Sequence, residues 1–343
     1  MKAPHNNFTL IRTLLAVLVV FGHFKILSGG AALGIFGYAD FAVDAFFVIS
    51  GYLVYGSFDK QQCVGSFYIR RFFRIYPLYA VVIILQGLVM AYLAGSGAAP
   101  AHELPRYLGL NLVFANFAAP GFGTLLQPLL NPGINPSLWT LKIEVAFYLL
   151  LPLLWYFTKR FGITFLLLIY IASSVYVAMA LHYDAYTVAK QLPGKIRFFA
   201  IGMGLYCCCN AIKIPLVYAI ISALLLFAFC SMRFHIYLAL FILVYPLCGG
   251  LLVYICALRL PALPLKYDIS YGIYLIHGPL IQFSLLLHWF SNTPRFFCML
   301  LATVMTLAFV ASQSIEKPMI DLGHWLSERW AKRRKTATGT PYV

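Results

Sequence analysis

The stretch FTLIRTLLAVLVVFGHFKIL, residues 8–27, decides the fold class of this chain. Its 20 residues are almost all apolar, which is the length that an α-helix needs to cross about 30 Å of hydrocarbon. Arg12 and His23 interrupt the run eleven residues apart, so in a helix they share one face and stand about 16 Å apart along its axis. An arginine in mid-span costs about 3 kcal/mol on insertion scales. We therefore expect this face to line the protein interior or a water-filled cavity.

Apolar runs of similar length recur along the whole chain, which is 62% hydrophobic and only 10% charged. This composition predicts an all-α fold, a polytopic membrane bundle of about ten transmembrane helices. We expect one transmembrane domain over 1–318 and a basic tail over 319–343, and a re-entrant or interfacial piece within 104–127. The expected spans are 8–27, 39–58, 76–94, 138–157, 162–182, 196–210, 214–232, 234–256, 268–290 and 295–315.

The distribution of the 25 Lys and Arg residues predicts the orientation. Most of them fall into inner loops and tails if the N-terminus is cytoplasmic, so the positive-inside rule places both termini in the cytoplasm. The net charge of +15 then reflects topology and attraction to anionic membrane lipid. We do not expect nucleic-acid binding.

Three arginines form a basic knot, RRFFRIYP over 70–77, between two apolar runs. If this segment is helical, Arg74 lies near both Arg70 and Arg71, and such a cluster suits a phosphate-bearing ligand. The alternative is a positive-inside anchor, and the sequence leaves both open. The chain shows no metal-ligand spacing, no Gly-rich nucleotide loop and no nucleophile elbow, and its eight cysteines follow no disulfide pattern.

Asp44 and Glu144 each lie a few residues inside an expected span that enters from the outer side. His23 lies in the outer half of its own span, so we expect all three at similar depth. Two carboxylates beside an imidazole would orient it and tune its basicity. The alternatives are a helix–helix hydrogen bond for His23, bracing for Asp44, and pairing of Glu144 with Lys142 or another outer-side base.

The chain resembles the acyltransferase-3 family of membrane O-acyltransferases, which includes enzymes that O-acetylate bacterial surface polysaccharides. Seven segments in the same order carry the resemblance. They are Arg12 to His23, VDAFFVISGY (43–52), RRFFRIYP (70–77), SLWTLKIE (137–144) with Phe147-Tyr148 and Pro152, RFFAIG (197–202), SYGIYLIH (270–277) and Glu316-Lys317-Pro318. Thr140 departs from the serine that is common in relatives, which is a mild change.

The resemblance implies a ten-helix core in a bacterial inner membrane that passes an acyl group, usually acetyl, from cytoplasmic acyl-coenzyme A to a sugar hydroxyl on the far side. It implies acetyl-coenzyme A as co-substrate, no bound cofactor or metal, and a polysaccharide such as O-antigen or a lipid-linked glycan as acceptor. His23 falls on the family's candidate catalytic histidine, and Arg70, Arg71 and Arg74 fall on its donor motif. Further candidates from the same segments are Trp139, Arg197, Ser270, Tyr271 and His277. We expect the short form of the family, without a C-terminal hydrolase-like domain.

In this interpretation the thioester arm of coenzyme A runs past Arg12, and His23 removes the proton of the attacking hydroxyl. The sequence offers no clear base-paired serine or cysteine, so it favours direct transfer over an acyl-enzyme. The alternative function is a transporter or flippase of a lipid-linked sugar, although no inverted repeat of broken helices is visible. The sequence does not specify the acceptor sugar, its hydroxyl or the acyl chain.

Overall fold

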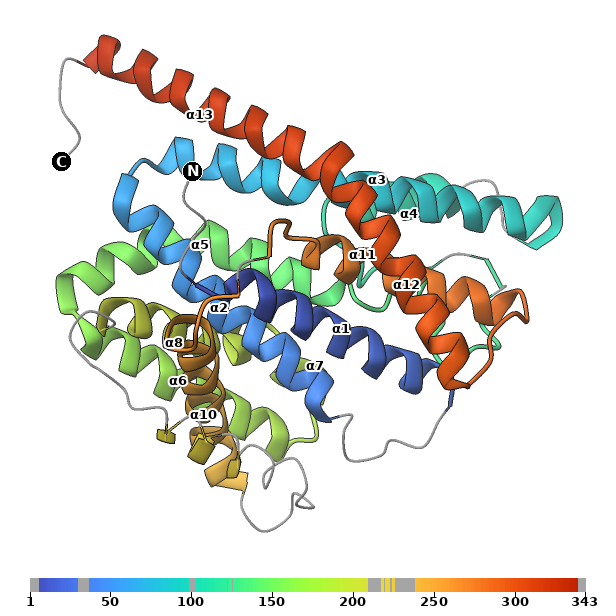
Figure 1. Cartoon of the computed structure of the whole chain (residues 1–343), viewed down its shortest axis with the longest axis horizontal. Helices are drawn as coiled ribbons and strands as arrows, with labels where there is room; N and C mark the ends of the chain where they lie inside the picture. The colour runs from blue at the N-terminus through green and yellow to red at the C-terminus, as the bar shows by residue number, and fades with distance from the viewer. Residues whose placement is uncertain are drawn as a thin grey trace. The chain divides into compact units, whose positions relative to one another are not determined.

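The computed structural model describes residues 6–29, 37–98, 103–121, 123–124, 126–208, 217–218, 220–222, 224–225, 238–263 and 265–338. These residues form helices and connecting segments, with no strand among them (Figure 1). Their contacts divide the chain into two compact units. Unit 1 comprises residues 1–15, 34–62 and 143–266, and unit 2 comprises 16–33, 63–142 and 267–343.

Unit 1 is built around α2, which packs along α8, and α8 packs in turn along α6. The start of α1 (Phe8–Leu27) belongs here, as does α5 (Trp139–Phe161) from Ile143 onward. The remaining elements are α2 (Gly37–Gln61), α6 (Ile163–His182), α7 (Tyr186–Ala189), α8 (Leu192–Cys208) and α10 (Leu238–Leu258).

Unit 2 contains the second part of α1 and the first residues of α5. Its other elements are α3 (Val64–Ala98), α4 (Glu103–Leu112), α11 (Ser270–Leu286), α12 (Pro294–Ala311), the π-helical turn η2 (Ser312–Glu316) and α13 (Lys317–Thr338). Here α13 packs along α3, and α12 packs along α11. Most residues of α11 are buried, including the polar side chains of His277 and Gln282.

Six helices of the described part are long and apolar enough to cross a bilayer. The predicted all-α membrane fold is therefore confirmed, whereas the expected number of ten spans is not. The predicted span 8–27 coincides with α1, and 162–182 differs from α6 by one residue. The span 214–232 lies largely outside the described residues. Near 104–127 the structure has α4, whose ten residues extend about 15 Å and are too short to span.

Two expected boundaries differ from the structure. The helix predicted to begin at residue 76 begins at Val64, so the basic knot is part of α3 and not a connecting segment. The helix predicted to end at residue 315 continues through η2 into α13, so residues 319–338 of the expected tail are helical. In both places polar and charged residues lowered the local hydropathy while the backbone remained helical.

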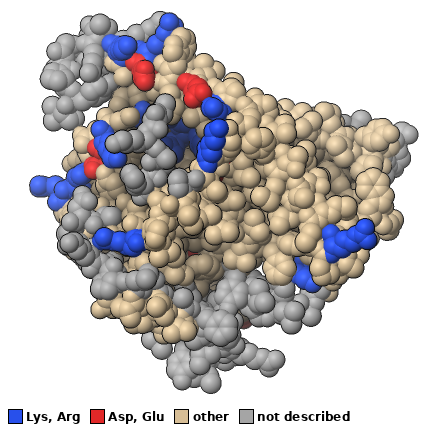
Figure 2. All heavy atoms as spheres, viewed as in Figure 1, with Lys and Arg blue, Asp and Glu red and all other residues tan. Residues whose placement is uncertain are grey.

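The outer faces of the helices are apolar. On α6, large aliphatic side chains at helical spacing are more than half exposed, namely Leu167, Leu168, Ile171 and Val175. Figure 2 shows one face of the molecule, on which uncharged residues predominate and charged side chains are few. Soluble proteins rarely expose contiguous apolar surface of this kind, whereas lipid covers it at no cost. These surfaces are those of an integral membrane protein.

Glycines permit the close approach of α2 and α8. A Cβ at Gly51 would lie 2.3 Å from the carbonyl oxygen of Phe199, and one at Gly202 would lie 2.1 Å from that of Val48. Both clashes are with backbone, which cannot rotate away as a side chain can. Small residues at such crossings are the usual basis of tight helix packing in membranes.

We expect Gly51→Ala or Gly202→Ala to lower the free energy of unfolding by about 1–3 kcal/mol, because the added methyl forces the two backbones apart. Thermal unfolding of the purified protein in detergent measures the change. Gly109→Ala in α4 is the matched control, because a Cβ there meets no atom within 4 Å. Equal unfolding temperatures for Gly202→Ala and Gly109→Ala would contradict this packing.

Candidate active site

Two histidines and a serine meet in unit 2. Nδ1 of His23 on α1 lies 2.7 Å from Nε2 of His277 on α11, and the two rings stack with their centroids 5.0 Å apart. Oγ of Ser137 lies 3.1 Å from His277 Nε2 and 3.4 Å from His23 Nδ1. Three polar side chains from distant parts of the sequence thus form one hydrogen-bonded group. We call it the histidine pair with Ser137.

Helix α11 holds His277 in place. Its Nδ1 lies 2.9 Å from the carbonyl oxygen of Ile273, one turn earlier in the same helix. The helix begins where Asp268 accepts hydrogen bonds from the backbone N–H and the hydroxyl of Ser270. These bonds order the residues just before α11, whose N-cap residue Ile269 makes no side-chain cap hydrogen bond.

The segment before α5 holds Ser137. Asn135 accepts a hydrogen bond from the backbone N–H of Ser137 and donates through Nδ2 to the carbonyl of Leu275 on α11. The carbonyl of Ser137 accepts a hydrogen bond from the hydroxyl of Tyr274, which also lies 2.6 Å from Thr140 Oγ1. These bonds tie the serine to the same helix that carries His277.

The three side chains differ in exposure. Ser137 and His277 are both 0% exposed, whereas His23 is partly exposed. Phe24, the next residue on α1, is buried against the rings of Phe290, Phe296 and Phe297. His23 is therefore held on a fixed helix and is the most exposed of the three side chains.

The histidine pair has the geometry of a hydrogen-bonded base and not that of a metal centre. Among the described residues, no group of three or more His, Cys, Asp or Glu side chains is placed to hold a metal ion. The 2.7 Å separation of the two ring nitrogens is also a hydrogen-bond distance, which leaves no room for an ion between them.

The basic knot lies on α3 in the same unit. Arg74 forms salt bridges from Nη1 to Glu316 at 3.0 Å and from Nη2 to Asp268 at 3.1 Å. The guanidinium of Arg71 lies over the ring of Phe67 at 5.6 Å. Arg70 interacts electrostatically with Glu328 on α13, and its buried Nη2 has no hydrogen-bond partner in the described part of the chain.

Ser270 and Tyr271, two further candidates, have structural hydrogen bonds. Ser270 donates its hydroxyl to Asp268, just before the helix, and the hydroxyl of Tyr271 donates to the carbonyl of Ile75 on α3 at 2.8 Å. The Tyr271 contact joins α11 to the basic knot, and the two bonds are sufficient to explain both side chains.

The candidate site residues that lie in unit 1, Asp44 and Arg197, interact with other residues of unit 1. Asp44 pairs with Lys195 at 2.5 Å inside the α2–α8 contact, which agrees with a bracing role. Arg197 donates to the carbonyl of Ile242 at 3.0 Å and lies over the ring of Phe198. The expected grouping of Asp44 and Glu144 with His23 stays a prediction, since His23 belongs to the other unit.

Glu144 accepts hydrogen bonds from the hydroxyls of Ser50 at 3.1 Å and Tyr148 at 2.5 Å. Lys142, its suggested partner, instead lies over the ring of Phe117 within unit 2. Arg12 is partly buried in α1, and Trp139 is the first residue of α5 and also partly buried.

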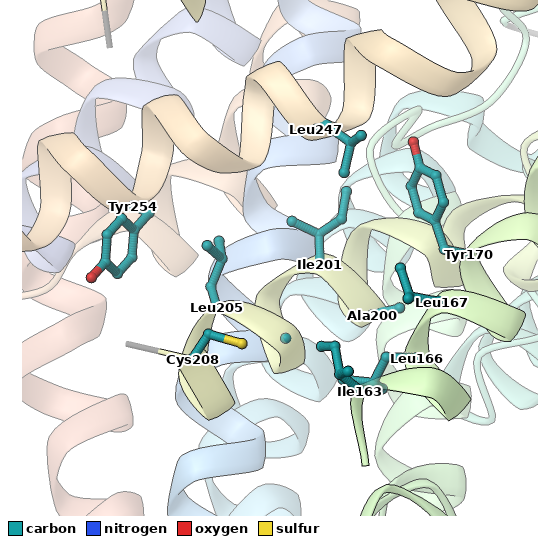
Figure 3. Close-up of a pocket in the computed structure, with 11 residues that line it drawn as sticks. Ile163, Leu166, Leu167, Tyr170, Ala200, Ile201, Leu205, Cys208, Leu247 and Tyr254 are labelled. Carbon is teal, nitrogen blue, oxygen red and sulfur yellow. The ribbon is translucent and has the colours of Figure 1, made fainter. Parts of the chain in front are cut away.

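Unit 1 also contains an apolar cavity of about 280 Å³ between α6, α8 and α10 (Figure 3). Leucine and isoleucine side chains dominate its lining, as Leu167, Ile201 and Leu247 illustrate. Of the two tyrosines in the lining, Tyr170 on α6 donates its hydroxyl to the carbonyl of Leu243. The described lining is hydrocarbon apart from two tyrosines and the thiol of Cys208, and it includes no histidine or carboxylate, so we do not assign catalysis to it.

The sequence interpretation missed Ser137 and the pairing of His277 with His23. The sequence offered no clear base-paired serine, whereas in the structure Ser137 lies within hydrogen-bond distance of His277 Nε2. The available signal was a polar residue directly before an apolar helix and a histidine within another. Neither pattern shows which helices are neighbours.

Comparison with known proteins identifies the family of this chain. A family profile described as "Acyltransferase domain" matches residues 5–313. "Nodulation protein 10" of Rhizobium leguminosarum bv. viciae is 28% identical over 214 residues, which are 58% of this chain and 58% of that protein. "Acyltransferase MdmB" of Streptomyces mycarofaciens is 33% identical over 128 residues, 37% of this chain and 31% of that protein.

"O-acetyl transferase" of Shigella phage Sf6 is 29% identical over 150 residues, 42% of this chain and 44% of that protein. The chain thus spans about a third to three-fifths of the lengths of these relatives. No solved structure is significantly similar to it. The family match nevertheless extends over nearly the whole sequence and includes both histidines of the pair, so this protein belongs to the acyltransferase-3 family.

Proposed function

We propose that this protein is a membrane O-acyltransferase that moves an acyl group, acetyl in the simplest case, from acyl-coenzyme A to a hydroxyl of a surface or exported polysaccharide such as O-antigen. The observation that carries the proposal is the histidine pair, in which His23 is held by a hydrogen bond and remains partly exposed. The names of two relatives, an acyltransferase and an O-acetyl transferase, support the same reaction class.

In the proposed reaction His23 acts as a general base. It takes the proton of the acceptor hydroxyl as the hydroxyl oxygen attacks the thioester carbonyl. The C–S bond breaks, the new C–O bond completes the ester, and the thiolate of coenzyme A receives the proton from His23. Such a positioned base typically contributes a rate factor of about 10²–10⁴.

For the donor we propose Arg70 and Arg71 as ligands of the coenzyme A phosphates, with Arg12 along the path of its thioester arm. Arg70 supports this role because its buried Nη2 lacks a hydrogen-bond partner in the described residues, and a phosphate oxygen would supply one. Arg74 already has two carboxylate partners, which makes it less available to an anion.

Transfer of label from [¹⁴C]acetyl-coenzyme A to the glycan fraction tests the proposed function. The assay uses membranes of cells that make the glycan, with and without the protein. We expect label in the glycan only when the protein is present. Movement of unlabelled lipid-linked sugar across the membrane, with no label transferred, would instead favour the transporter.

We further propose that the membrane is a bacterial inner membrane, with both termini and the basic knot on the cytoplasmic side. In a cysteine-light protein, a single Cys at residue 61 in place of Gln should react with an impermeant thiol reagent only after the membrane is opened. A single Cys in place of Ser291 should react in intact cells. The physical reason is the positive-inside bias. The reverse pattern would overturn this orientation.

A further inference from the structure

We propose that His277 and Ser137 are positioning residues that hold His23 in the one tautomer whose Nε2 can accept the proton of the acceptor hydroxyl. This inference rests on the proposed function and assigns the roles of two buried residues within it. It follows from which atoms can donate and which can only accept.

The contact between His277 and Ile273 determines where the proton of His277 lies. A carbonyl oxygen only accepts hydrogen bonds, so the ring nitrogen 2.9 Å from it, Nδ1, carries the hydrogen. The other contacts of His277 are a hydroxyl and a second imidazole, both uncharged groups. A fully buried imidazolium without a counter-charge is costly, so His277 is neutral and its Nε2 presents a lone pair.

That lone pair determines the tautomer of His23. Nδ1 of His23 lies 2.7 Å from it, and two lone pairs at this distance would repel each other. Nδ1 of His23 therefore carries the hydrogen and donates it. In a neutral imidazole the other nitrogen, Nε2, then has the free lone pair. Nε2 has no recorded partner among the described residues, which suits a base that must meet a substrate.

Burial assigns Ser137 to the same supporting role. Its hydroxyl is within hydrogen-bond distance of a histidine, as in a serine nucleophile, but Ser137 is 0% exposed and His277 behind it is also 0% exposed. A thioester carbonyl would have to reach a closed interior. Oγ at 3.4 Å from His23 Nδ1 instead offers a second, weaker acceptor on the side where His277 already binds.

Two substitutions of His277 test the proposal with the full-length protein in membranes. His277→Gln keeps an acceptor oxygen near the place of Nε2, and His277→Leu has similar volume but no acceptor. We expect His277→Leu to lower kcat on the order of 100-fold with the KM for acetyl-coenzyme A unchanged, since loss of an orienting hydrogen bond acts on the base and not on the donor. His277→Gln should retain at least a tenth of the wild-type kcat. Equal kcat values in the two variants would overturn the proposal.

Ser137→Ala keeps the proposal falsifiable if His277→Leu does not fold. We expect its kcat to stay within about tenfold of wild type, because only the weaker acceptor is lost. A different outcome would overturn the proposal and show Ser137 to be a nucleophile. In it, the wild-type protein becomes labelled by [¹⁴C]acetyl-coenzyme A, whereas Ser137→Ala neither becomes labelled nor transfers the acyl group. Absence of transfer by the wild-type protein would refute the proposed function itself. Failure of the proposed function can therefore be distinguished from failure of the positioning roles of His277 and Ser137.

Discussion

Replacing His23 with alanine is expected to reduce acyl transfer about 10²- to 10⁴-fold while leaving the protein folded in the membrane. The imidazole is the partly exposed member of the histidine pair, so its loss removes the proposed base without opening the helix packing. His277 would remain buried and lose one hydrogen-bonded neighbour, a loss of about 1 kcal/mol of stability. The measurement is the initial rate of label transfer from acetyl-coenzyme A, normalised to protein in the membrane.

His182→Ala is the matched control for this prediction. His182 is an exposed histidine at the end of α6 and touches none of the site residues described above. It should transfer label at the wild-type rate, which excludes a general effect of removing an imidazole. Wild-type transfer by His23→Ala would remove His23 from the mechanism.

The sequence predicted the helices well where hydropathy alone defines them. Residues 8–27 coincide with α1 because the run is apolar apart from a few isolated polar residues such as Arg12 and His23. The sequence-based boundaries were wrong at α3 and at α13. In α3 the helix includes Arg70, Arg71 and Arg74, and in α13 it continues through the polar residues after Lys317. Hydropathy marks where a helix meets lipid, and a helix continues past that point as long as its backbone hydrogen bonds do.

The site was predicted less completely, because its contacts are long-range. Arg12 and His23 were placed on one face from their spacing, and such local geometry is fixed by the helix itself. His277 is separated from His23 by 254 residues, and Ser137 by 114. One sequence does not show which helices are adjacent, so it singled out His23 as a candidate without showing its hydrogen-bond partners.

The partners of Arg74 illustrate the same limit. The sequence suggested an arginine cluster for phosphate from the spacing within one helix. In the structure Asp268 and Glu316, which are 194 and 242 residues away along the chain, take both ends of the Arg74 guanidinium. Glu316 is 2% exposed and closes the π-helical turn η2, and Ser312 of that turn bonds to the carbonyl of Asp268. Arg74 thus joins α3 to the start of α11 and the end of η2.

Replacing Arg74 with alanine should therefore destabilise the protein by about 3–5 kcal/mol, because it leaves a buried carboxylate without its counter-charge. The double variant Arg74→Met/Glu316→Gln should recover at least half of that loss, since the deeply buried charge of Glu316 is then removed together with that of Arg74, and only the more exposed Asp268 keeps its charge. Thermal unfolding in detergent measures both effects. Arg71→Ala is the comparison: we expect near wild-type stability and a raised KM for acetyl-coenzyme A. Arg74→Ala could instead unfold at the wild-type temperature and raise the KM for acetyl-coenzyme A. In that case the main role of Arg74 is to bind the donor and not to pair with its two carboxylates.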